Sequence, residues 1–255
     1  MARFDLTDVE WAIISPLLPN KPRGVPRTDD RRVLNGIFYI LRTGSPWRDL
    51  PERYGPYTTV YNRYNRWAKA GVWLRIFEAL AARSPQSLQF IDSSIIRAHQ
   101  HAAGGKKGGP DHAIGRSRGG LSTKIHAVVD ERGLPVKLLL TPGQASDAQT
   151  APALVQALPA ARAFVGDRGY DARALVELVN ARGGCAQIPT QRDRKIQRSV
   201  DRELYRKRNL VERFFNKLKH FRRIATRFDK LARNFLAAVA LASTRIWLRD
   251  YESTT

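Results

Sequence analysis

The sequence has little cysteine, little acid and no long apolar run, and each shortage excludes a class of protein. Cys185 is the single cysteine of 255 residues, which rules out internal disulfides and any zinc site built mainly from thiolates. The longest apolar run, FLAAVALA at 235–242, is too short to span a bilayer, and no segment has the pattern of a signal peptide. We therefore expect a cytoplasmic protein without a membrane partner, with Cys185 as a small core residue.

Acidic residues are outnumbered by basic ones, 23 to 44, so the formal net charge is +21. The basic charge is concentrated between residues 191 and 233, where 16 lysines and arginines stand against 5 aspartates and glutamates. A chain tolerates self-repulsion of this size when its partner is a polyanion. Nucleic acid is the first candidate, ahead of an acidic membrane surface. The hydrophobic content of 43% is ordinary for a globular protein.

The N-terminal third has helical periodicity. Thr7 and Glu10 have the spacing of a capping box, and a second helix is predicted from about Asp30 to Arg42, with Gly44 as its stop. A longer helix ending at Gly71 and a last helix over 72–82 lead to Ser84-Pro85, the predicted boundary of a helical domain covering 1–85.

One of these helices carries a polar face that suits DNA. Asn, Arg and Lys on the exposed side of the second helix after a tight turn are what a helix-turn-helix places in the major groove. The residues concerned are Asn62, Asn65, Arg66 and Lys69. The alternative is a plain helical bundle with a polar surface.

From residue 86 to the C-terminus the pattern changes to alternating strands and helices. Strands are predicted at 88–96, 123–130, 135–140, 163–166 and 186–188, the second and third as a hairpin. Helices are predicted at 148–158, 172–182 and 235–248, and the glycine-rich stretch 102–120 as a loop. We therefore expect an α/β fold with a mixed five-stranded sheet and flanking helices.

The basic stretch 205–219 is predicted to form an amphipathic helix. At about 100° per residue, Tyr205, Arg208, Glu212 and Lys219 fall within roughly 60° of one another. The opposite side carries the apolar stripe, with Leu204, Leu210, Val211, Phe214, Leu218 and Phe221. A carboxylate flanked by a phenol and two cations is thereby presented on the side that does not pack. A solvated charged face is the alternative interpretation.

Two aspartates upstream favour a catalytic interpretation of this helix. Asp92 lies within an apolar strand, where an unpaired carboxylate would be costly to bury. Asp167 follows another apolar strand, at the position where ligands bind in open α/β sheets. Together with Glu212 they supply three carboxylates, which are hard ligands for Mg²⁺ or Mn²⁺. Two such ions can activate a nucleophile and stabilise a leaving oxygen in phosphodiester chemistry. Taken singly, each Asp could instead be a cap or a strand-end residue.

Three blocks of sequence resemble the DDE transposases of bacterial insertion sequences, most closely the insertion-sequence-five group. They are FIDSSIIRAH around Asp92, FVGDRGYD around Asp167, and the Tyr-x2-Arg-x3-Glu-x6-Lys pattern at 205–219. The linking stretch 119–147 also resembles the group, so the resemblance covers nearly the whole chain.

The resemblance implies an RNase H-like catalytic domain over 86–255, preceded by a DNA-end-binding domain over 1–85. It further implies that Asp92, Asp167 and Glu212 hold two catalytic Mg²⁺ or Mn²⁺ ions. Tyr205, Arg208 and Lys219 would then contact DNA near the cut.

The expected partners are the terminal inverted repeats of the element and the target DNA, bound by a homodimer or larger assembly at the bacterial nucleoid. A structure-specific nuclease of similar fold and a decayed, non-catalytic DNA-binding copy are the alternatives. His99 and His101 are expected to be exposed or to face phosphate rather than to bind a metal ion.

Overall fold

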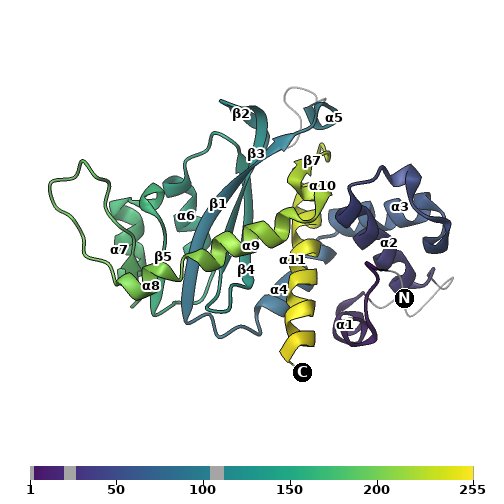
Figure 1. The fold of residues 1–255 in the computed structure, drawn as a ribbon, viewed down its shortest axis with the longest axis horizontal. Coiled ribbons are helices and arrows are strands. Elements are labelled where there is room, and N and C mark those ends of the chain that lie inside the picture. Colours follow the sequence, from purple (N-terminus) through teal and green to yellow (C-terminus); the bar gives the residue numbers. More distant parts are fainter. Residues whose placement is uncertain (1–2, 20–26, 104–111, 255) are drawn as a thin grey trace. The chain divides into compact units, whose positions relative to one another are not determined.

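The computed structural model describes residues 3–19, 27–103 and 112–254, which form two compact units (Figure 1). The helical unit comprises Met1–Leu80, Ala98–His112 and Leu218–Thr255. The sheet unit comprises Ala81–Arg97 and Ala113–Lys217. Within the described ranges, none of the helices combines the length and apolar character needed to cross a bilayer.

The helical unit contains most of the helices. They are α1 (Asp8–Ile14), η1 (Ser15–Leu17), α2 (Asp30–Thr43), η2 (Trp47–Asp49), η3 (Glu52–Tyr54), α3 (Tyr57–Lys69), α4 (Val72–Ala81), α5 (Gln100–Ala103), α10 (Arg222–Ala225) and α11 (Ala232–Thr254), with the short strand β7 (Thr226–Arg227).

The local signals of the first two long helices are confirmed. Thr7 and Glu10 form the capping box of α1. Gly44 ends α2 in the left-handed conformation, with φ of 75°, which glycine adopts without steric cost. The apolar stripe of α2, which includes Leu34, Ile37 and Leu41, is fully buried in the core of the unit.

The long C-terminal helix α11 packs in this helical unit, whereas the sequence pattern assigned it to the sheet domain. Tyr64 on α3 donates to the carbonyl oxygen of Asn234 at 2.5 Å, and Arg245 pairs with the buried Glu10 of α1 at 2.9 Å. Local periodicity predicts a helix over 235–248 but carries no information about its partner. The packing position of the helix is determined by these contacts with residues distant in sequence.

The sheet unit is built on six strands. They are β1 (Leu88–Ala98), β2 (Gly115–Ser117), β3 (Gly120–Val129), β4 (Pro135–Pro142), β5 (Ala163–Val165) and β6 (Cys185–Gln187). The helical elements that accompany them are α6 (Asp147–Gln156), η4 (Arg168–Tyr170), α7 (Arg173–Ala181), α8 (Arg202–Arg206) and α9 (Asn209–Lys219), whose last two residues belong to the helical unit.

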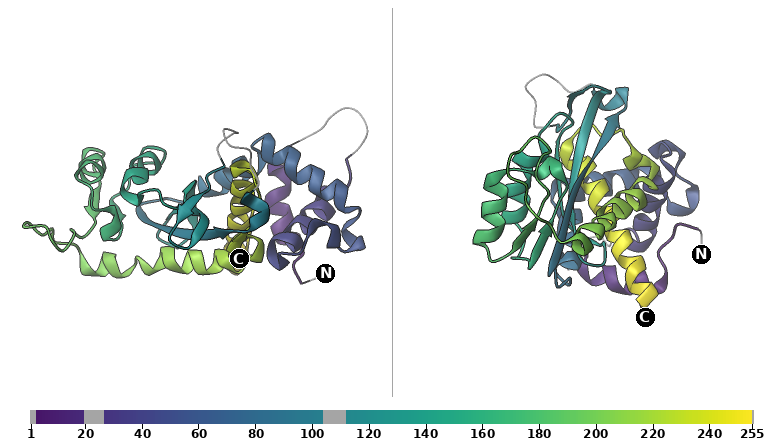
Figure 2. Two further views of the ribbon diagram at one scale, coloured as in Figure 1. Left: turned by 90° about the horizontal axis from the view of Figure 1, so that it is seen from above. Right: turned by 60° about the vertical axis from the view of Figure 1, so that its left-hand side comes forward.

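The sheet is mixed, as predicted. β3 pairs antiparallel with both β1 and β4, while β5 pairs parallel with both β1 and β6, which gives the order β4-β3-β1-β5-β6. Helices α6 and α7 cover one face, and α8 and α9 run along the other (Figures 1 and 2). Three antiparallel strands followed by two parallel ones, with helices on both faces, form the RNase H-like core that the resemblance implied.

Three local expectations need correction. Residues 104–111 of the predicted loop lie outside the described residues, but part of its remainder forms β2, which turns into β3 through Gly120 at φ of 97°. Cys185 is exposed rather than in the core, because it begins the edge strand β6. The helix predicted over 205–219 is divided by a turn at Lys207 and Arg208.

Candidate active site

Asp92 and Asp167 are brought together by the parallel pairing of β1 with β5. Phe90 lies opposite Val165 in the register of the two strands. Each aspartate follows its member of that pair by two residues, and neighbouring strands lie about 4.8 Å apart. Both carboxylates therefore belong to the same end of the same strand pair, which is where ligands bind in sheets of this kind.

Glu212 on α9 is connected to Asp92 through one cation. Arg208 Nη1 lies 3.0 Å from Asp92 Oδ2, and the Nη2 atom of the same guanidinium contacts Glu212 Oε1. The Asp92 and Arg208 side chains are each 21% exposed and that of Glu212 is 48% exposed. The cation predicted to face DNA thus lies between two of the three predicted acids.

The turn at 207–208 has a structural cause that also places this arginine. Arg208 N donates to the Tyr205 carbonyl, and Val211 N donates to the Arg208 carbonyl. Each of these hydrogen bonds joins residues three positions apart, as in a 3₁₀-helix. Such bonds wind the chain more tightly than an α-helix does. The ideal helical wheel therefore does not apply across this turn. Arg208 nevertheless stays one turn before Glu212, within reach of its carboxylate.

The electrostatics of the cluster follow from burial and like charges. Burial raises the pKa of the Asp92 carboxyl; the Ser93 backbone N–H and Arg208 oppose this, and Asp167 and Glu212 raise the pKa further. Burial lowers the pKa of the Arg208 guanidinium, but Glu212 and Asp92 more than offset it and the net shift is upward. Arg208 therefore remains charged and partly neutralises an acidic cluster.

Asp167 is held by its own turn. Its Oδ1 accepts from Gly169 N at 2.8 Å and caps η4. The capping role that the sequence left open for this residue is thus present, and it leaves the second carboxylate oxygen outside the cap. Across the described residues, no three His, Cys, Asp or Glu side chains stand close enough to hold a metal ion as they are placed.

The oxygens of this cluster are nevertheless of the type that binds a hard cation. Asp92 and Glu212 both direct a carboxylate oxygen at the same positive charge, that of Arg208. Asp167 lies close enough to shift the pKa values of both Asp92 and Arg208. Carboxylate oxygens are the ligand type that Mg²⁺ and Mn²⁺ prefer. A metal ion could take the place of the guanidinium if Arg208 moved away.

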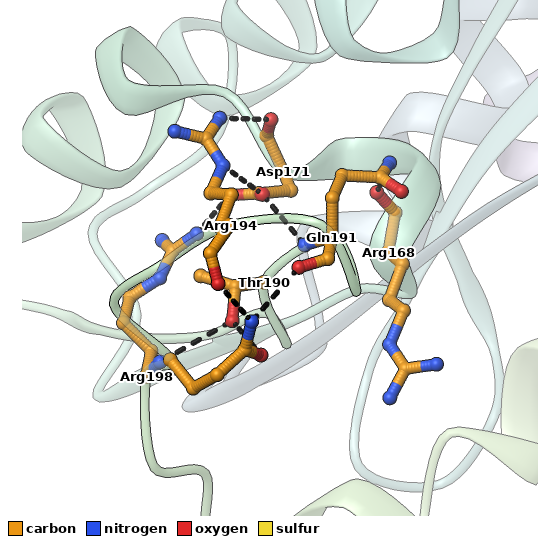
Figure 3. Close-up of polar contacts among 7 residues, drawn as sticks. Arg168, Asp171, Thr190, Gln191, Arg194 and Arg198 are labelled. Atoms are coloured by element: carbon orange, nitrogen blue, oxygen red, sulfur yellow. Dashed lines mark hydrogen bonds and ion pairs between the residues drawn. The ribbon is translucent and has the colours of Figure 1, made fainter.

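A second carboxylate of the same block, Asp171, organises the chain next to the cluster (Figure 3). Its side chain is 1% exposed and accepts from Gln191 N at 2.8 Å, from Arg194 Nε at 2.6 Å and from Arg198. Burial raises the pKa of the Asp171 carboxyl, but the hydrogen bonds from Gln191 N and Arg194 and the charges of Arg198 and Arg194 more than offset it, so the net shift is downward. The basic segment that follows β6 is thereby fastened beside η4. Sequence reasoning missed this role, because it depends on residues about twenty positions away.

The remaining members of the motif are Tyr205 and Lys219. Tyr205 is half-buried on α8 and contributes to the raised pKa of Arg208. Lys219 is exposed at the end of α9 and belongs to the helical unit. There it lines a depression of about 520 Å³ whose other cations include Arg3, Arg42 and Arg222. Such a cluster of cations is suited to a phosphate group.

The polar face of α3 is partly open. Asn62, Arg66 and Lys69 are exposed, whereas Asn65 is half-buried and accepts from Asn234 Nδ2 at 2.8 Å. A shallow depression of about 370 Å³ lies on this face, lined by Asn62, Asn65 and Arg66 among others. His101 is exposed and His99 half-buried, with their rings 4.6 Å apart.

Comparisons with known proteins identify relatives for both parts of the chain. Residues 6–77 match the family "Putative transposase of IS4/5 family", and residues 83–247 match the family "Transposase DDE domain". The chain is 39% identical over 130 residues to the "Putative transposase for insertion sequence element IS6501" of Brucella ovis, covering 51% of this chain and all of that protein.

Two further similarities are more distant or more local. The "Insertion element IS402 uncharacterized 16.2 kDa protein" of Burkholderia cepacia is 40% identical over 112 residues, 38% of this chain and 76% of that protein. A solved structure, "Mos1 transposase paired-end complex with left transposon end", aligns over 92% of this chain and 82% of its own, with 12% identity and a TM-score of 0.27. That score is too low to bear on the fold.

Proposed function

The chain belongs to the DDE-domain transposases, and we propose that it binds the terminal inverted repeats of an insertion element, cleaves the DNA there and joins the freed ends to target DNA. The observation that carries this proposal is the placement of Asp92 and Asp167 just beyond the same end of the paired segment of β1 and β5, with Glu212 joined to Asp92 through Arg208.

Asp92, Asp167 and Glu212 would hold the two Mg²⁺ or Mn²⁺ ions. When bound, such ions activate the attacking oxygen and stabilise the leaving oxygen of a phosphodiester. Arg208 would give up its contacts with Asp92 and Glu212 and pair with a DNA phosphate, since a guanidinium binds phosphate and carboxylate through the same fork of N–H donors. The positive charge removed from the acids is thereby transferred to the scissile strand.

Residues 1–85 would recognise the end of the element. The open face of α3, with Asn62, Asn65, Arg66 and Lys69, presents amide and guanidinium groups of the kind that read base edges in the major groove. The depression around Lys219 would take a backbone phosphate, and Tyr205 would contact DNA close to the cut.

We further propose that the protein acts as a homodimer or larger assembly on DNA, because two ends of one element must be cut and joined together. Its place of action would be the nucleoid in the bacterial cytoplasm, where both the element and its targets lie.

The test is a set of single substitutions in the three acids, with cleavage and binding measured separately. Asp92→Asn, Asp167→Asn and Glu212→Gln should each abolish Mn²⁺-dependent cleavage and strand transfer on an oligonucleotide carrying the element's end. DNA binding should remain near wild type, because cations supply the contacts with phosphate. Glu203→Gln, which removes an exposed acid on the neighbouring helix α8, is the matched control.

The size of the loss in cleavage decides whether each acid belongs to the site. A variant that keeps cleavage within about tenfold of wild type has lost only about 1.4 kcal/mol of transition-state stabilisation, too little for a residue that holds a catalytic ion. Such a residue is not part of the site. Cleavage without strand joining by the wild-type protein would identify a nuclease instead.

A further inference from the structure

A cavity of about 580 Å³ lies within the helical unit. Its walls come from η2, the first half of α3, α10, the segment between β7 and α11 and the start of α11, with His101 of α5. Four aromatic side chains contribute to the lining, namely Trp47, Tyr57, Tyr61 and Phe228. None of these residues belongs to the machinery described above.

Two of these four rings are exposed, and the other two are half-buried. Trp47 and Tyr61 lie 5.3 Å apart between ring centroids, tilted by 58°. Tyr57 and Tyr61, one turn apart on α3, remain 37% and 40% exposed. The Arg223 guanidinium lies 5.5 Å from the Trp47 ring and 5.6 Å from the Phe228 ring. Exposed aromatic faces of this kind are platforms on which bases stack.

Two buried polar atoms of the lining have no hydrogen-bond partner among the described residues. They are the donor Trp47 Nε1 and the acceptor Asp229 Oδ2. Arg223 Nε lies 3.9 Å from Asp229 Oδ2, beyond hydrogen-bond distance. Buried polar groups in folded proteins are nearly always satisfied. A ligand that carries both functions would satisfy this donor and this acceptor once the side chains that cover them move aside.

The cavity also has exposed cations. Arg48 and Lys230 line it and are both accessible to solvent. Aromatic walls, a donor, an acceptor and cations are the features that hold an extrahelical nucleotide, whose base stacks and bonds by its edge while its phosphate needs positive charge.

We infer that this cavity binds a single unpaired nucleotide of the DNA substrate, with its base between the aromatic rings and its phosphate at Arg48 or Lys230. The inference rests on the proposed function in requiring DNA as the partner, but it concerns a site separate from the three acids. Trp47 Nε1 would donate to an acceptor on the base edge, and Asp229 would accept from an amino or imino N–H.

The experiment uses the full chain and two kinds of oligonucleotide. One is a duplex with a single unpaired 2-aminopurine, and the other is the same duplex with the position fully paired. Base fluorescence reports stacking, and the anisotropy of a distant dye reports affinity. Deoxyadenosine monophosphate alone is the third probe, since a free nucleotide shares the chemistry. We expect wild type to quench the unpaired base strongly and to bind the free nucleotide far more weakly.

The variants separate base binding from general DNA binding. Tyr61→Ala should weaken binding of the duplex with the unpaired base about tenfold, the range expected for one lost stack, and leave binding of the paired duplex unchanged. Asp229→Asn should change which unpaired base is preferred, because an amide donates as well as accepts. Val9→Ala, which trims another exposed apolar side chain of the same unit, is the control and should alter neither.

The outcomes are distinct. Equal losses on both duplexes in Tyr61→Ala would overturn the inference, as would an unquenched base or a free nucleotide that binds as tightly as the DNA. Failure of the wild-type protein to bind either duplex would overturn the proposed function itself. A melting temperature for each variant verifies that the fold is retained.

Discussion

Replacing Arg208 with glutamine should make the DNA-free protein bind metal more tightly while it binds DNA more weakly. The guanidinium contacts Asp92 at 3.0 Å and also contacts Glu212, so a metal ion that needs those oxygens must first displace it. Glutamine keeps some length and polarity but removes the charge. The two effects have opposite signs because the same cation competes with metal and attracts phosphate.

The magnitude follows from how exposed the pairs are. The Glu212 side chain is about half exposed, and those of Asp92 and Arg208 are about one-fifth exposed. Ion pairs with this much access to water contribute up to about 1 kcal/mol each. Losing both therefore corresponds to about 1–2 kcal/mol, or about 5- to 30-fold in Mn²⁺ affinity. One fewer phosphate contact should reduce the salt slope of DNA binding by about one.

The assay is calorimetric titration of Mn²⁺ into DNA-free wild type, Arg208→Gln and Arg213→Gln at fixed ionic strength, with DNA binding measured over a salt series. Arg213 is an exposed cation one residue beyond Glu212 and serves as the matched control for loss of charge. If the two arginine variants bound Mn²⁺ equally, Arg208 would act only through the overall positive charge of the protein and not through its contacts with the two acids. If Arg208→Gln bound Mn²⁺ more weakly than wild type, the arginine would be assembling the acids rather than blocking them. Either result refutes the reasoning.

Two further predictions concern the sheet and the polar face of α3. His126, fully buried on β3 with Nε2 2.8 Å from Thr141 Oγ1, has its pKa lowered to about 4 by burial and by Lys124, with Asp147 opposing. Since its folded pKa lies below the unfolded value of about 6.5, stability is lost as pH falls from 6.5 towards 4, and wild type should lose about 2 kcal/mol more than His126→Gln between pH 7 and 5. Urea melts of both proteins at the two pH values measure this difference, and parallel losses would exclude His126 as the cause. Arg66→Ala should reduce discrimination between the element's end and random DNA by about 1–3 kcal/mol if Arg66 reads a base. Competition binding measures it, with Arg75→Ala, an exposed arginine on α4, as control; an unchanged preference would remove Arg66 from the reading face.

The sequence predicts the parts of this fold that depend on local periodicity. Strands β1, β3, β4 and β5 and helices α2, α6 and α7 appear within a few residues of their expected bounds, because alternation and helical spacing are properties of short segments. The sequence also marks Asp92 and Asp167 as acids within or directly after apolar strands. Their approach depends on the parallel pairing of β1 with β5, which no local pattern predicts.

The contacts that depend on distant partners could not be predicted in this way. Residues 232–254 are helical by pattern, but nothing local shows that Arg245 pairs with Glu10 across the helical unit. Asp171 resembles an ordinary turn residue, and its role becomes visible only when Gln191, Arg194 and Arg198 come to lie around it. Asp171, whose side chain is 1% exposed beside two arginines, holds this part of the chain together. Composition alone shows only that the acid reduces the local positive charge.

The position of Arg208 shows why a residue's type and spacing do not settle its role. A cation one turn before Glu212 suits a DNA phosphate, and the motif places it there. The same cation also lies within hydrogen-bond distance of Asp92, more than a hundred residues earlier. If the cluster binds metal and DNA as proposed, it needs a counter-charge before they arrive, because unscreened carboxylates raise one another's pKa values. Arg208 can supply that charge and then transfer it to the incoming strand. The acids would thus be partly neutralised before the substrate arrives and would become free to bind metal when a phosphate competes for the guanidinium.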